Sequence, residues 1–175
     1  MRAEHSYQFN RQRGLKTLLL KSLSLFSSVR LYNVIIVAIA QFLAAVFIMA
    51  PGLSVTSILL DYKLWLIILA SSAAIAGGYI INNFYDREKD LINRPQKTLL
   101  ENQVRRSTLW SVYFVVNAVA FILGSIVSWR AGLFFALYIF AMWFYSHKLK
   151  RILFLGNLMA ALLAVTPFFV LFSAS

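Results

Sequence analysis

Residues 64–83 read LWLIILASSAAIAGGYIINN, a run of 20 residues without a charged side chain. An α-helix rises about 1.5 Å per residue, so a run of this length spans the roughly 30 Å hydrocarbon core of a bilayer. The run therefore predicts a transmembrane helix, and the two asparagines at its end need a separate explanation.

Four further apolar runs accompany it in a chain that is 61% hydrophobic. Soluble domains contain roughly 45–50% apolar residues, so this excess indicates a membrane protein. The four runs cover residues 33–51, 109–129, 131–146 and 155–173. Together the five runs predict an all-α fold, a polytopic membrane helical bundle with about five transmembrane helices.

Lysine and arginine are concentrated in alternate segments between these runs. The residues before the first run contain six, and the later segments contain 1, 6, 1, 3 and 0. The positive-inside rule then makes the N-terminus and the loop after residue 83 cytoplasmic, in a multi-pass protein of a bacterial-type plasma membrane. Residues 1–32 are predicted to be a cytoplasmic amphipathic segment, and residues 33–175 the transmembrane domain. The net charge of +11 is spread over loops, which argues against a nucleic-acid partner.

The end of the central run carries regularly spaced polar residues. Asn82, Asp86 and Asp90 are four residues apart, so they share one face if the helix continues. Two carboxylates near the negative end of a helix are unfavourable unless a cation is close. Magnesium suits such a position, because it takes oxygen ligands and is often held by one or two carboxylates together with substrate phosphates.

The spacing alone leaves two interpretations open. In the first, Asp86 and Asp90 hold Mg²⁺ against a diphosphate group. The neighbouring residues able to assist are Asn82, Asn83, Arg94 and Lys97. In the second, the segment is an ordinary solvated helix end in which Asp86 pairs with Lys89. His147, in a later loop, is expected to be exposed and without a role.

The stretch NNFYDREKDLINRP, residues 82–95, resembles the first aspartate-rich motif of the UbiA family of intramembrane prenyltransferases. That motif is usually written NDxxDxxxD and is commonly followed by an Asn-(Arg/Lys)-Pro turn. Asn82, Asp86 and Asp90 match it. Asn83 stands where the family normally has aspartate, so one ligand charge is lost.

Two further segments support the resemblance. VRLYN, residues 29–33, is similar to the family's Arg-Pro-x-Asn start but lacks the proline. YSHKLKRILFLGN, residues 145–157, looks like the family's Tyr-Ser-x-x-Leu-Lys loop followed by Gly-Asn. This segment most resembles the branch that makes geranylgeranylglyceryl phosphate ethers. The resemblance covers about residues 25–172.

The resemblance implies a helical bundle around a central cavity and a Mg²⁺-dependent prenyltransferase. Such an enzyme moves an isoprenoid chain from a prenyl diphosphate to an acceptor, such as a glycerol-phosphate ether lipid or an aromatic quinone precursor. It implies that Asp86 and Asp90 are catalytic and bind the metal together with Asn82. The diphosphate contacts that it implies are Asn33, Asn82, Asn83, Arg94, Lys97, Tyr145 and Lys150.

The family's second aspartate-rich motif has no counterpart in this sequence. The acids outside residues 86–90 are Glu4, Asp61 and Glu101, which form no paired motif. The sequence is therefore expected to be the first part of a larger UbiA-like bundle, completed by a missing C-terminal half or a partner subunit. The alternative is a non-catalytic membrane subunit or small transporter that uses the aspartate cluster for ion binding or helix pairing.

Overall fold

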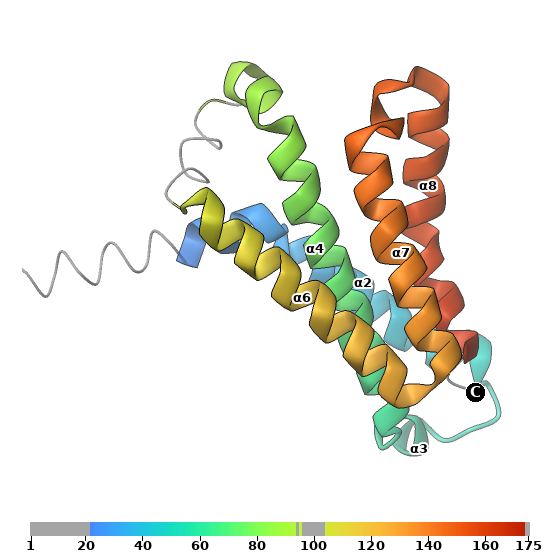
Figure 1. The fold of residues 1–175 in the computed structure, drawn as a ribbon. Helices are drawn as coiled ribbons and strands as arrows, with labels where there is room; N and C mark the ends of the chain where they lie inside the picture. Colours follow the sequence, from blue (N-terminus) through green and yellow to red (C-terminus); the bar gives the residue numbers. More distant parts are fainter. Residues whose placement is uncertain (1–21, 94, 96–103, 174–175) are drawn as a thin grey trace, which may run out of the picture.

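The computed structural model describes residues 22–93, 95 and 104–173, and this part of the chain is built of helices, without a β-strand (Figure 1). After a helical segment at 22–29, the elements are α2 (Leu31–Ala44), the π-helical turn η1 (Ala45–Met49), α3 (Val55–Leu59), α4 (Tyr62–Asn93), α6 (Arg106–Val127), α7 (Trp129–His147), the 3₁₀ turn η2 (Leu149–Arg151), α8 (Leu153–Phe169) and the 3₁₀ turn η3 (Val170–Ser173). The prediction of an all-α fold is confirmed.

Four helical stretches are long and apolar enough to cross a membrane: Leu31–Met49, Tyr62–Asn93, Arg106–Val127 and Leu153–Phe172. They match four of the five predicted spans. The fifth, α7, has 19 residues but is not among them, because Arg130 and the polar tips of its aromatic residues reduce its hydropathy. Trp129, predicted to end the third span, instead begins α7, because the chain turns at Ser128, whose Oγ accepts from the Ala131 N–H at 3.1 Å.

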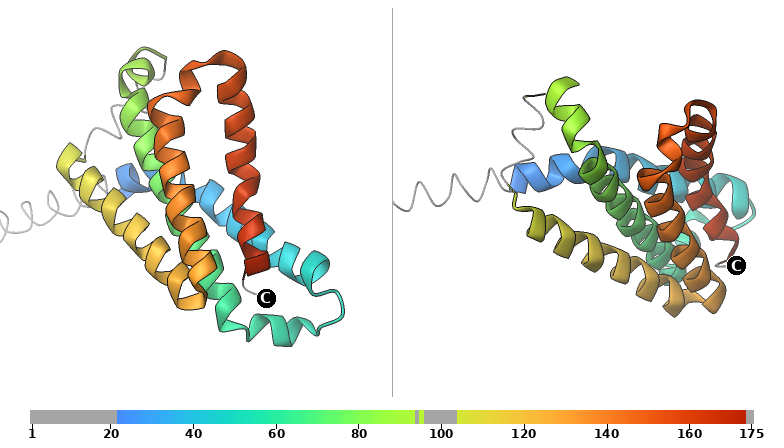
Figure 2. Two further views of the ribbon diagram at one scale, coloured as in Figure 1. Left: turned by 45° about the vertical axis from the view of Figure 1, so that its right-hand side comes forward. Right: turned by 45° about the horizontal axis from the view of Figure 1, so that its top comes forward.

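α4 is the central helix of the bundle and packs against α2, α6 and α7 (Figures 1 and 2). Its middle is enclosed, and Ile67 and Ala70 expose none of their surface. Its small residues let neighbouring helices approach closely: a Cβ atom added at Gly77 would lie 2.7 Å from Oδ1 of Asn117 on α6. Close packing of this kind holds membrane helices together, because lipid tails are as apolar as leucine and hydrophobic burial contributes little.

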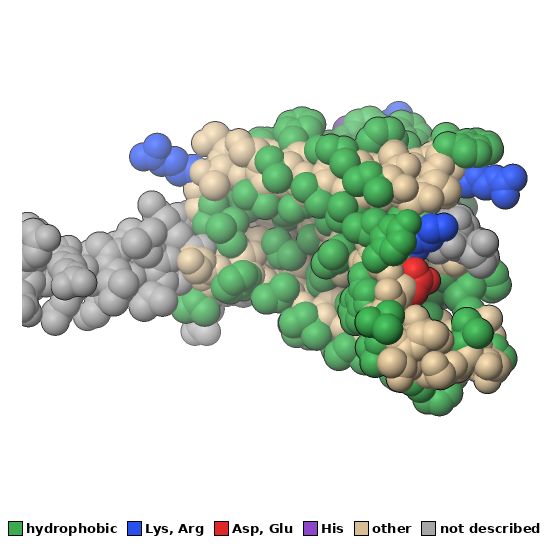
Figure 3. All heavy atoms as spheres, turned by 90° about the horizontal axis from the view of Figure 1, so that it is seen from below, with side chains coloured by type: hydrophobic (Ala, Val, Ile, Leu, Met, Phe, Trp, Pro, Cys, Tyr) green, Lys and Arg blue, Asp and Glu red, His purple; other side chains and the backbone are tan. Residues whose placement is uncertain are grey.

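The outward faces of the surrounding helices are apolar. Large side chains such as Ile36 on α2, Phe114 on α6 and Leu162 on α8 are exposed. Viewed from the end of the bundle that carries α3, hydrophobic side chains are spread among other side chains and backbone, with a few Lys, Arg and acidic groups (Figure 3). Apolar outward faces of this kind suit lipid or further helices as neighbours, and not water.

Two polar contacts connect α8 to other helices at membrane depth. Pro167 lies inside α8 and has no N–H, so the Leu163 carbonyl lacks its helical donor. The Tyr138 hydroxyl of α7 donates to this carbonyl at 3.3 Å. Gln41, fully buried on α2, donates to the Pro167 carbonyl at 2.7 Å and to Oγ of Ser71 on α4 at 3.0 Å. Hydrocarbon offers these two carbonyl groups no hydrogen-bond donor, so the donors come from neighbouring helices and the hydrogen bonds join those helices to α8.

Removing the Tyr138 hydroxyl should cost stability only while residue 167 is proline. Tyr138→Phe is expected to lower the free energy of unfolding by about 1 kcal/mol, because the Leu163 carbonyl loses its donor. In a Pro167→Ala background the helix N–H returns to that carbonyl, and the same substitution should have almost no effect. Unfolding in mixed micelles, followed by circular dichroism, measures this double-mutant cycle. Equal losses in both backgrounds would contradict the assignment.

Two glycines at helix contacts should respond differently to alanine. A Cβ atom at Gly124 would overlap the ring of the buried Phe135 and lie 3.2 Å from the Ala131 carbonyl oxygen. At Gly78 it would overlap only the flexible end of Met142. Gly124→Ala is therefore expected to destabilise the protein by about 1–3 kcal/mol, and Gly78→Ala by much less. The unfolding assay described above ranks them, and the reverse order would refute this packing argument.

Candidate functional site

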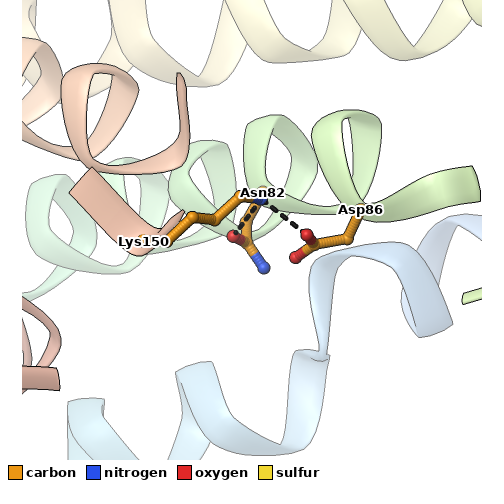
Figure 4. Close-up of polar contacts among 3 residues, drawn as sticks. All are labelled: Asn82, Asp86 and Lys150. Carbon is orange, nitrogen blue, oxygen red and sulfur yellow. Dashed lines mark hydrogen bonds and ion pairs between the residues drawn. The ribbon is translucent and has the colours of Figure 1, made fainter. Parts of the chain in front are cut away.

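The candidate site lies on the C-terminal part of α4, beside the connection between α7 and α8. From η2, Lys150 extends its ammonium group to α4, where Nζ donates to Oδ1 of Asp86 at 2.7 Å and to Oδ1 of Asn82 at 3.2 Å (Figure 4). The side chains of Lys150 and Asp86 are only 11% and 24% exposed, so their ion pair is screened less than a surface pair. Tyr145, near the end of α7, is close enough to Asp86 for an electrostatic interaction.

α4 presents both oxygens together because it remains a regular helix well past its apolar run, to Asn93. Side chains four residues apart lie one above the other, so Asn82 and Asp86 point to the same side, as the sequence predicts. Both therefore reach one ammonium group, although Lys150 is 64 positions from Asp86 in the sequence.

Two other predicted site residues, Asp90 and Asn83, also lie on α4. Asp90 is half-buried one turn beyond Asp86 and makes no ion pair with the described residues. Asn83 is half-buried on the same stretch of α4. The predicted residues Arg94 and Lys97, and most of the predicted segment 1–32, lie outside the described residues.

Asn82 and Asp86 fit a divalent cation. Their oxygens already converge on one cationic group, and amide and carboxylate oxygens are donors that Mg²⁺ accepts. Within the described ranges, no group of three or more His, Asp or Glu side chains could hold a metal by itself. A Mg²⁺ ion at this position would need water or phosphate oxygens for its remaining coordination, which is usual for Mg²⁺ beside a phosphorylated substrate.

Aromatic side chains border the ion pair. Nζ of Lys150 lies 5.8 Å from the ring centre of Tyr85, and that ring lies 5.3 Å from His147. His147 also stacks on Trp143 at 5.6 Å. The expectation that His147 is an exposed loop residue is wrong: the residue is half-buried, and its Nδ1 atom has no hydrogen-bond partner in the part of the chain described. The reason is that α7 continues through His147, which carries the imidazole against α4.

A second polar contact lies one turn earlier on α4. Nδ2 of Asn33, on α2, donates to the Tyr79 hydroxyl at 3.2 Å, and the Arg30 guanidinium lies 5.4 Å from the centre of the same ring. Arg30 has a φ of 50°, the left-handed conformation, where the helical residues before it turn into α2. Asn33 thus contacts Tyr79, which lies on α4 about one turn before Asn82. The sequence analysis missed Tyr79, although its position three residues before Asn82 was a usable signal.

A cavity of about 290 Å³ lies elsewhere in the molecule, lined by residues that include Met49, Asp61 and Leu171. Asp61 immediately precedes α4, so it is about 37 Å from Asp86 at the rise of an α-helix. The cavity and the ion pair therefore lie at opposite ends of α4, and the cavity is not part of the candidate site.

Comparisons with known proteins agree with this arrangement. The profile of the UbiA prenyltransferase family matches residues 38–175. The digeranylgeranylglyceryl phosphate synthase of Thermococcus gammatolerans is 40% identical over 106 residues, which are 59% of this chain and 38% of that protein. The synthase of the same name from Sulfurisphaera tokodaii is 33% identical over 137 residues, which are 78% of this chain and 47% of that protein.

A solved structure, described as that of a digeranylgeranylglyceryl phosphate synthase in membranes, superposes with a TM-score of 0.72. The superposition covers 85% of this chain and 51% of the solved one at 18% identity, so it shows a shared fold. The chain spans about half the length of the proteins that it matches. Because the family profile matches most of its residues, the chain belongs to the UbiA prenyltransferase family and is an integral membrane protein.

Proposed function

We propose that this chain forms the prenyl diphosphate-binding part of a Mg²⁺-dependent membrane prenyltransferase. The observation that carries the proposal is the convergence of the Asn82 and Asp86 oxygens on the Lys150 ammonium at one end of the central helix. A metal-bound diphosphate needs anionic oxygens for the metal and a cation for the phosphate, and both kinds of group are present here. Membership of the UbiA family supports this interpretation.

Each predicted residue has a role in this proposal. Asp86 and Asn82 hold the metal, with Asp90 one turn further along α4. Bound there, Mg²⁺ supplies a Lewis acid that neutralises charge developing on the leaving diphosphate. Lys150 and Tyr145 bind phosphate oxygens from the α7 side of the site. The further proposed diphosphate contacts are Asn33, Asn83, Arg94 and Lys97.

The proposed reaction transfers the isoprenoid chain as an electrophile. The bond between C1 of the chain and the diphosphate oxygen breaks, and its electron pair leaves with the diphosphate. An acceptor oxygen then forms the new bond to C1, and its proton passes to the released diphosphate. The apolar bundle would exclude water, which protects the electron-poor carbon and strengthens the electrostatic stabilisation of the leaving group.

The relatives' names favour one class of acceptor. Both curated relatives described above are digeranylgeranylglyceryl phosphate synthases, so we favour a glycerol-phosphate ether lipid over an aromatic quinone precursor. From the positive-inside rule we expect the Asp86 end of α4 at the cytoplasmic face of the membrane, which we propose to be a bacterial-type plasma membrane. Transfer is expected to need a second aspartate-rich motif, supplied by further helices of the polypeptide or by a partner subunit.

Asp86→Asn should strongly weaken metal-dependent diphosphate binding. It removes the carboxylate charge but keeps the side-chain size, so the affinity for geranylgeranyl diphosphate in the presence of Mg²⁺ should fall at least about tenfold. The matched control is Asp61→Asn, which makes the same change just before the other end of α4 and should leave the affinity unchanged. Isothermal titration calorimetry on the chain in detergent micelles, with Mg²⁺ or with EDTA, measures all three proteins.

The proposal is overturned if the chain shows no Mg²⁺-dependent affinity for geranylgeranyl diphosphate, or if Asp86→Asn leaves that affinity unchanged. Either result would favour the alternative of a membrane subunit or small transporter, in which the aspartates pair helices or bind ions without a prenyl substrate.

A further inference from the structure

Lys150 holds the two oxygens that the proposed function assigns to the metal. Its Nζ atom lies 2.7 Å from Oδ1 of Asp86 and 3.2 Å from Oδ1 of Asn82 (Figure 4). We infer that the Lys150 ammonium and a divalent cation compete for these oxygens, so that Lys150 must move to the diphosphate before the metal can bind tightly. The inference rests on the proposed function, because it assumes that this site takes a metal-bound diphosphate.

The two cations compete because they would draw on the same two oxygen atoms. Lys150 donates to Oδ1 of Asp86 and to Oδ1 of Asn82, so a metal ion that used this pair of oxygens would compete with the ammonium for them. Like charges at such short range repel strongly where solvent screening is weak. This site is largely withdrawn from solvent, since the Lys150 side chain is only 11% exposed.

The backbone at Lys150 packs closely against α8, and the side chain is the part of the residue that can move most easily. A Cβ atom added at Gly156, in the first turn of α8, would lie 3.0 Å from the Leu149 carbonyl oxygen and 3.1 Å from Cα of Lys150. The backbone of η2 therefore packs closely against the first turn of α8, which prevents η2 from moving toward α8. The Lys150 stem is a flexible chain of four carbons that can redirect its ammonium without such a shift.

Movement of the Lys150 ammonium from Asp86 to the diphosphate makes the binding of metal and diphosphate cooperative. A metal ion that arrives alone must separate Lys150 from Asp86 and leave the ammonium without an anion, since no other described residue forms an ion pair with Lys150. A metal ion that arrives with diphosphate brings a new anionic partner for the ammonium. By linkage, each ligand should then raise the affinity of the site for the other.

The test is Mn²⁺ binding to the 175-residue chain in detergent micelles, measured from the electron paramagnetic resonance signal of free Mn²⁺. Without diphosphate, Lys150→Met should bind Mn²⁺ about tenfold more tightly than the wild type, because the competing charge is gone while the apolar stem remains. Lys150→Arg keeps the charge and should bind as weakly as the wild type. The matched control is Lys148→Met, which removes an exposed charge two residues away and should change the affinity less than about twofold.

Inorganic diphosphate provides the second arm of the experiment. It should raise the Mn²⁺ affinity of the wild type several-fold more than that of Lys150→Met. If Lys150→Met binds Mn²⁺ no more tightly than Lys148→Met, the inference is overturned, whereas Mg²⁺-dependent prenyl diphosphate binding that needs Asp86 would leave the proposed function standing. If Asp86→Asn removes no Mn²⁺ binding from the wild type or from Lys150→Met, the proposed metal site fails and the inference fails with it.

Discussion

Hydrocarbon offers no hydrogen-bond partner, and this constraint determines how the helices of this protein are joined. Pro167 frees the Leu163 carbonyl inside α8, and the Tyr138 hydroxyl of α7 takes the place of the missing N–H. The Pro167 carbonyl lies in the last turn of α8, where helical donors run out, and Gln41 of α2 donates to it. Apolar contacts between helices gain little in lipid, so these polar contacts, together with close approach at glycine, select one arrangement of helices.

The same constraint acts at the end of α4, but there it involves charge. Asp86 is three-quarters withdrawn from solvent, and a carboxylate in that position needs a cation. Lys150 satisfies it from the turn between α7 and α8, and the contact fixes that turn against the central helix. The ion pair therefore occupies atoms that the proposed chemistry requires. Under the proposed function, binding of metal and diphosphate would break this contact between η2 and α4.

The sequence predicted the parts of the structure that depend on local order. The lengths of the apolar runs gave the helices, and the spacing of Asn82 and Asp86 gave their common face, because both follow from the helical period. The contact of Lys150 with Asp86 depends on how α7 and α8 fold back on α4, and no local pattern encodes it. The family resemblance suggested a diphosphate role for Lys150 but not this ion pair. His147 was misjudged for a related reason, since its burial depends on where α7 ends and on what α4 places beside it.

The neutral side chain of Asn83 affects the charge of the proposed site in the same direction as this ion pair. It stands where the family pattern has aspartate, so this face of α4 carries two carboxylates, Asp86 and Asp90. Two carboxylates balance one divalent cation, and a third would leave excess negative charge to attract a metal ion in the absence of substrate. The ion pair of Lys150 with Asp86 acts in the same direction, because it removes one of the two carboxylates from competition for the metal. Under the proposed function, both features would weaken the affinity of the site for a metal ion alone, and both would make tight binding depend on the negative charge that a diphosphate brings.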